Sequence, residues 1–283
     1  MKEQIDALLK DIKKLPQMSN VVVKILNLVN KKDVSINEVA AEISKDPSIT
    51  ASIIKLSNSA YYRASKPIKT VPESLMTLGL ETVKEIVMLS ASKAVLQKDL
   101  KGYQLEADEM WMHSLVVAEL SGKIVNLKKL PVAKDLAFTS GLLHDIGKVI
   151  LTQFFPLKVM EIRNELKNME TTFTEIEKKY FGYDHQEVGL KVLTYWNFPD
   201  ELKEVVSYHH NPDLATKFPL LTSIVHIANT ITVISGIGID IGGINQELSP
   251  FALKQTGISE KDLESIYTGI PEIQKQLIEL HRG

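Results

Sequence analysis

Apolar residues recur at intervals of three and four positions along almost all of this 283-residue chain. That spacing gathers them on one face of an α-helix, whereas a half-buried strand alternates with a period of two. No run of about 18 apolar residues occurs, as a membrane-spanning helix would require. We therefore expect an all-α fold without a membrane span.

Capping residues mark several helix starts. Ser35 and Glu38 have the spacing of a capping box, and Asp46 precedes Pro47 as a helix N-cap precedes a first-turn proline. Further helix starts of this kind are predicted at Val71-Pro72-Glu73 and Ser259-Glu260.

The predicted helices divide into three regions. We expect an N-terminal helical subdomain over 1–100, packed on a helical bundle over 101–235, and a C-terminal loop and helical extension over 236–283. The one glycine-rich passage, 236–243, does not lie between a strand and a helix as a dinucleotide-binding loop would. It is therefore interpreted as an apolar loop or a short pair of strands.

Composition excludes several classes of protein. Lys and Arg number 33 against 35 Asp and Glu, so the formal charge of −2 is unlike that of a strongly basic nucleic-acid binder. The chain has no cysteine, which removes disulfides, thiol catalysis and thiolate metal ligands and fits a reducing compartment. With no secretory signal at its N-terminus, the chain is predicted to be cytoplasmic.

Six of the seven histidines fall within 101–235, and several lie on apolar helix faces. His113, for example, precedes Val116, Val117 and Leu120 at helical spacing, so it faces the interior. A lone histidine of this kind is usually a hydrogen-bonded core residue. Several inward imidazoles and carboxylates are costly to bury, however, unless a shared divalent cation satisfies them. Imidazole with carboxylate suits Mn, Fe, Zn or Ni.

The segment Gly141-Leu-Leu-His144-Asp145-Ile-Gly-Lys148 resembles the defining motif of the HD phosphohydrolase superfamily. The resemblance implies a metal that activates water to attack a phosphoester. It implies that Asp145 and Lys148 act in catalysis if the chain is a hydrolase, with Lys148 contacting the substrate phosphate. The metal ligands implied by this resemblance and by related two-metal enzymes are His113, His144, Asp145, His185, His209, His210 and, at the distal position, Asn229.

Two positions depart from that superfamily. Asn229 stands where an aspartate is expected and brings no negative charge. The segment after His210 lacks the Gly-Tyr-Pro element of cyclic-di-GMP phosphodiesterases. The sequence leaves open which of His209 and His210 faces the site, because adjacent helical residues differ by about 100° in direction.

The segment Asn58-Ser59-Ala60-Tyr61 is the most specific part of a stretch, from about residue 14 to 210, that resembles the HDOD domain. HDOD domains are relatives of HD hydrolases in which the metal site is typically degraded. This resemblance implies a bacterial signal-transduction module that is non-catalytic and acts by binding a protein or a ligand. The alternative is a metal-dependent phosphohydrolase acting on a nucleotide or another phosphoester. The partner implied by the resemblance is a signalling protein.

Two local features have competing interpretations. Asn58 and Ser59 near a helix end are typical capping residues, and we favour capping over ligand contact. Leu78-Gly79-Leu80, where we expect a helix to break, resembles the turn of a helix-turn-helix. The acidic, apolar segment that follows makes a poor recognition helix, so DNA binding is not expected.

Overall fold

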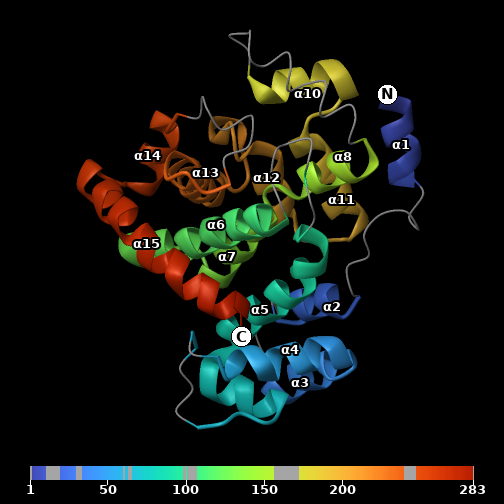
Figure 1. Ribbon diagram of the computed structural model, residues 1–283, viewed down its shortest axis with the longest axis vertical. Coiled ribbons are helices and arrows are strands. Elements are labelled where there is room, and N and C mark those ends of the chain that lie inside the picture. The colour runs from blue at the N-terminus through green and yellow to red at the C-terminus, as the bar shows by residue number, and fades with distance from the viewer. Residues whose placement is uncertain are drawn as a thin grey trace. The chain divides into compact units, whose positions relative to one another are not determined.

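The computed structural model describes residues 2–10, 20–29, 34–59, 61–62, 66–97, 100, 107–155, 172–238 and 247–282. Within these ranges the regular secondary structure is helical and no strand occurs, which confirms the predicted fold class (Figure 1). None of the described helices is long and apolar enough to cross a membrane.

The chain forms two compact units, one of residues 1–17 and 95–269 and the other of 18–94 and 270–283. The boundaries predicted near residues 100 and 235, and the packing of one subdomain on the other, stay predictions.

The larger unit contains the helices that carry the histidines. Its elements are α1 (Lys2–Lys10), α6 (Ala107–Lys128), α7 (Lys134–Leu143), α8 (Ile146–Phe154), α10 (Phe173–Phe181), α11 (His185–Tyr195), α12 (Asp200–Tyr208), the 3₁₀ turn η2 (Pro212–Leu214), α13 (Pro219–Ile234) and α14 (Pro250–Thr256). Helices α6 and α7 pack together, α13 packs on both, and α11 packs against α8 and α12. The core of this unit therefore joins helices that are far apart in the sequence.

The smaller unit contains α2 (Asn20–Val29), α3 (Ile36–Ile43) and α4 (Pro47–Ser57). Its helix starts are as predicted: Ser35 and Glu38 form a capping box, and the Asp46 carboxylate accepts hydrogen bonds from the first turn of α4. Ile36, the first residue of α3, is 42% exposed.

Asn58 has the structural role that the sequence favoured. Its Nδ2 donates to the carbonyls of Ile54 and Ile68, each at 2.7 Å, and its Oδ1 accepts from the Ile68 amide at 2.8 Å. The side chain thus ties the end of α4 to the segment that leads into the next helix.

Two long helices, α5 (Val71–Leu96) and α15 (Glu260–Arg282), each run from one unit into the other. Gly79 interrupts α5 with a φ of 83°, so the predicted break is confirmed. Helix α15 begins at the predicted residue, where Ser259 and Asp262 cap each other.

Candidate metal centre

Asp145 is the residue around which the predicted ligands gather. It shares with His144 the two-residue turn between α7 and α8, and it is 1% exposed. Its Oδ2 atom lies 2.6 Å from Lys148 Nζ. The same atom lies 3.3 Å from His144 Nε2 and 3.8 Å from His113 Nε2.

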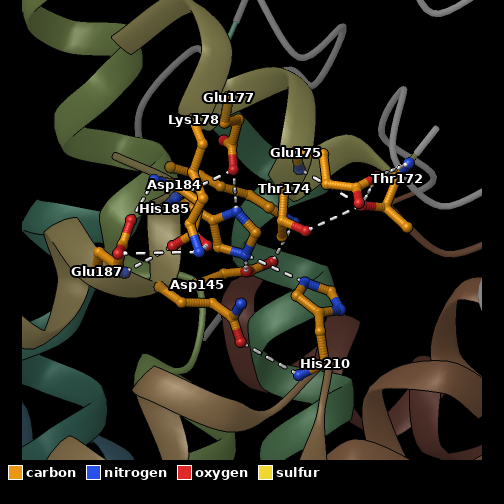
Figure 2. A network of polar contacts seen from close by, with 12 residues as sticks. Asp145, Thr172, Thr174, Glu175, Glu177, Lys178, Asp184, His185, Glu187 and His210 are labelled. Carbon is orange, nitrogen blue, oxygen red and sulfur yellow. Dashed lines mark hydrogen bonds and ion pairs between the residues drawn. The ribbon is translucent and has the colours of Figure 1, made fainter. Parts of the chain in front are cut away.

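The other oxygen of Asp145 faces the histidines of α11 and the end of α12. Oδ1 lies 3.4 Å from His185 Nε2 and 3.5 Å from His209 Nε2. His185 Nε2 in turn lies 3.1 Å from His210 Nε2, and Figure 2 shows His185 between Glu177, His210 and Asp145. Both neighbouring histidines therefore belong to the site, because the chain leaves its helical path where α12 ends.

Two glycines allow the site helices to approach closely. A Cβ at Gly141 would lie 2.8 Å from the Val117 carbonyl oxygen, so this position lets α7 contact α6. A Cβ at Gly147 would lie 1.8 Å from the His185 carbonyl oxygen, where α8 crosses α11. The glycine at position 141 of the motif therefore serves helix packing.

Four of the site histidines share one orientation. In His113, His144, His185 and His209, Nδ1 faces an oxygen acceptor and Nε2 faces Asp145. A ring nitrogen facing an acceptor carries the proton in the neutral ring, which leaves Nε2 with a lone pair available to a cation. The acceptors are Ile237 O for His113 (3.1 Å), Gly141 O for His144 (2.7 Å), Glu177 Oε2 for His185 (2.6 Å) and Val206 O for His209 (3.1 Å).

Burial controls the charge of these rings. It lowers the pKa of His113 to about 4 and that of His209 to about 3, and it holds the pKa of His210 well below its usual value. Burial also acts to lower the pKa of His185, but the Glu177 carboxylate outweighs it and raises that pKa. Most of the cluster is therefore neutral near pH 7, the form that binds metals.

The Asp145 carboxylate is held as an anion. Burial alone would raise its pKa, but the Lys148 ammonium and His144 outweigh that effect and hold it well below the ordinary range. The site thus offers one anionic oxygen ligand among imidazole nitrogens, of which those of His113, His209 and His210 are neutral near pH 7.

These residues fit a divalent cation. Within the described part of the chain, two groups of ligand atoms lie close enough together to hold an ion, and both include Asp145. Asp145 Oδ1 and His209 Nε2 are buried without a hydrogen-bond partner, although buried polar atoms normally have one. The groups are Asp145 with His185, His209 and His210, and Asp145 with His113 and His144.

For two predicted site residues, Asn229 and Lys148, the predicted role stays a prediction. Asn229 is buried on α13, which packs on α6 and α7, and its role as a ligand stays a prediction. Lys148 is buried against Asp145, and its predicted contact with a substrate phosphate is likewise untested.

Sequence reasoning missed the groups that orient the ligands. Glu177 is fully buried on α10 and binds both the ring and the backbone amide of His185. Its position was a usable signal, since it is a carboxylate on the same helix face as Phe173, Ile176 and Phe181. The Ile237 carbonyl lies in the glycine-rich passage interpreted as an apolar loop or a short pair of strands. Residues 236–238 form a turn and bend there, and 239–243 lie outside the described residues.

His226 was also not assigned a role. Its Nδ1 donates to the His209 carbonyl at 2.8 Å, and its Nε2 accepts from the Ser249 amide at 3.0 Å. It therefore links a candidate ligand to the start of α14.

The HDOD domain family model matches residues 15–212 of the chain. An uncharacterised protein of Treponema pallidum is 26% identical over 230 residues, which cover 78% of this chain and 43% of that protein. The chain thus spans less than half the length of this curated relative.

Solved structures share the fold. An HDOD domain protein of unknown function from Geobacter sulfurreducens is 25% identical, with a TM-score of 0.78 and 98% of each chain covered. A protein of Marinobacter aquaeolei, provisionally assigned to signal transduction, is 17% identical and has a TM-score of 0.76, with 99% of this chain and 64% of that chain covered. A protein of Shewanella amazonensis, provisionally assigned as a phosphohydrolase, is 23% identical and has a TM-score of 0.66, with 96% and 98% covered.

Proposed function

Since the chain belongs to the HDOD domain family, we propose that it is a bacterial signal-transduction module that holds a divalent cation in its core and acts by binding a protein or a ligand, without turnover. Asp145 and the surrounding histidines would hold the cation. Such an ion, when bound, can polarise a phosphoryl oxygen or lower the pKa of a bound water.

The burial of the ligand set supports the non-catalytic part of the proposal. His144, His185 and His209 are 0% exposed, and His113 is 2% exposed. A catalytic metal keeps a coordination position open to water and substrate. A set of ligands this deeply enclosed is better suited to a structural or regulatory ion.

The charge of the site supports the same proposal. Asn229 supplies no anion, and Lys148 forms an ion pair with Asp145 at 2.6 Å. The resemblance assigns this lysine to a substrate phosphate. Engaged with Asp145 and 4% exposed, it is poorly placed to receive one.

A metal-dependent phosphohydrolase is the second candidate. It is favoured by the oriented imidazoles, because a degraded site has no need to keep an acceptor on Nδ1 of His113, His144, His185 and His209. His210 is the one residue of its ligand group that is not fully buried, and it would mark the side from which a small phosphoester could enter.

Turnover and metal content separate the two candidates. Protein purified without chelator is assayed by elemental analysis. It is then tested with nucleotides, cyclic dinucleotides and phosphomonoesters in the presence of Mn, Fe, Ni or Zn. The proposal expects bound metal and no turnover. Robust turnover abolished by His144→Ala and Asp145→Ala would establish the hydrolase instead.

A further inference from the structure

The candidate metal centre has two lobes, one on each oxygen of Asp145. We call the group of His185, His209 and His210 beside Oδ1 the Oδ1 lobe. The group of His113 and His144 beside Oδ2 is the Oδ2 lobe. The two lobes share one carboxylate but differ in what else surrounds them.

Charge distinguishes the lobes. In the Oδ2 lobe the Lys148 ammonium lies 2.6 Å from Asp145 Oδ2, nearer than either imidazole of that lobe. A cation already neutralises this oxygen. A second cation there would be repelled at short range inside a poorly screened interior.

The Oδ1 lobe has a negative charge nearby in place of a positive one. Behind His185 lies the buried Glu177 carboxylate, which accepts from His185 Nδ1 at 2.6 Å (Figure 2). This arrangement of carboxylate, histidine and inward-facing nitrogen orients the ring and raises the basicity of a metal ligand. Two carboxylates therefore serve this lobe.

The hydrogen-bond pattern also favours the Oδ1 lobe as the site of a cation. The buried atoms of the ligand groups that lack a hydrogen-bond partner, among the described residues, are Asp145 Oδ1 and His209 Nε2. Both belong to the Oδ1 lobe, and they face each other at 3.5 Å. A cation would satisfy both atoms.

We propose that a single divalent cation binds in the Oδ1 lobe, through Asp145, His185, His209 and His210, and that the Lys148 ammonium keeps a second cation out of the Oδ2 lobe. This inference rests on the metal-binding part of the proposed function. It assigns Lys148 a role as a built-in cation, in place of contact with a substrate.

Metal stoichiometry tests the proposal directly. The chain of 283 residues is stripped with chelator, dialysed against Mn²⁺ and measured by elemental analysis and by electron paramagnetic resonance. Wild type is expected to bind one Mn²⁺ with the spectrum of an isolated ion. Lys148→Met is expected to bind two ions with a spin-coupled spectrum. Lys254→Met, which changes an exposed lysine of α14, is the matched control and should behave as wild type.

Ligand variants locate the ion. His185→Gln and His210→Gln should weaken Mn²⁺ binding by more than the roughly 10–100-fold that loss of an outer-shell partner costs. His144→Gln and His113→Gln should leave affinity within about threefold, a free-energy change below about 0.7 kcal/mol. Circular dichroism shows whether each variant is folded. The two variants for each lobe ensure that one misfolded protein does not decide the outcome.

Each result bears on the proposal. A single ion lost in the His144 and His113 variants but kept in the His185 and His210 variants would overturn the lobe assignment and leave metal binding intact. Two ions in wild type would overturn the role of Lys148. No binding to wild type or Lys148→Met would overturn both this inference and the metal-binding part of the proposed function.

Discussion

Asp145 shows how one side chain can organise a site built from α6, α11, the end of α12 and the turn between α7 and α8. Its two oxygens are approached by histidines that arrive from α6, α11 and the end of α12 and by His144 in its own turn. Each ring is held from behind by an acceptor, so the inward nitrogens have little freedom to turn away. The groups behind the ligands are therefore as testable as the ligands.

Glu177→Gln should weaken metal binding without unfolding the chain. The amide can still contact His185 Nδ1, but it lacks the charge that raises the pKa of this ring. Affinity for Mn²⁺ should fall on the order of 10–100-fold, as for other outer-shell partners. Isothermal titration calorimetry measures the change. Glu175→Gln on the same helix, where glutamine can also complete the capping box, should bind like wild type; equal losses in the two variants would argue against a specific role.

The metal-free protein should lose stability as the pH falls from 6.5 to about 4. His113 and His209 have lowered pKa values when folded, so the unfolded chain takes up their protons first and is favoured by acid. His185 has a raised pKa when folded, so the stability that it contributes is lost as the pH rises above 6.5. Urea unfolding in the presence of chelator should show a maximum near pH 6.5 and an acid-side loss greater than about 1.4 kcal/mol. A flat profile over this range would contradict the buried, neutral state of these rings.

The crossing of α8 and α11 depends on the absence of a side chain at one position. Gly147 lies where the backbone of α11 passes, and the same segment of α8 carries Lys148 toward Asp145. The geometry of the candidate site is therefore inseparable from the distance between these two helices.

Gly147→Ala should destabilise the protein by at least about 1–3 kcal/mol, the usual cost of overpacking. The new methyl group would overlap the His185 backbone, which cannot move without shifting α11. Gly269→Ala in α15 is the control, because its Cβ meets nothing within 4 Å. That variant should be neutral or gain up to about 1 kcal/mol. The free energy of unfolding in urea distinguishes them, and similar values would show that the crossing is looser than described.

Asn58→Asp should lower the stability of the helix pair that it joins. The carboxylate cannot donate to the carbonyls of Ile54 and Ile68, so two hydrogen bonds are lost, at a cost of about 1–2 kcal/mol. The same change at Asn197, an exposed turn residue with φ 56°, should stay within about 0.5 kcal/mol. Thermal or urea unfolding compares the two. A neutral effect at Asn58, with altered ligand binding, would favour the ligand-contact interpretation instead.

The two compact units should respond differently to metal, because every predicted ligand lies in the larger one. A cation bound only by the folded state stabilises it by about 2.7 kcal/mol when present at 100 times its dissociation constant. That stabilisation should appear where the ligands are, and the smaller unit provides an internal reference.

Hydrogen exchange measures this difference. Mn²⁺ should slow amide exchange in α8, α11 and α12 of the larger unit and leave α3 and α4 of the smaller unit unchanged. Mg²⁺ at the same concentration is the control, since it prefers oxygen ligands to imidazole. Equal protection in both units, or the same protection with Mg²⁺, would count against a metal site at Asp145.

Helical periodicity, capping pairs and the Gly79 break are local signals, because each depends on residues within one or two turns of one another. The all-α fold and the starts of α3, α4 and α15 could therefore be predicted from the chain. The identity of the residues around Asp145 is predicted from the resemblance to the HD phosphohydrolase superfamily. The pairing of each ring with its acceptor could not, since Glu177 and Ile237 reach their histidines only after distant helices pack. The contrast between the lobes could not be predicted either. The ion pair of Lys148 with Asp145 Oδ2, and the lack of a hydrogen-bond partner at Asp145 Oδ1, both depend on how α8, α11 and α12 pack.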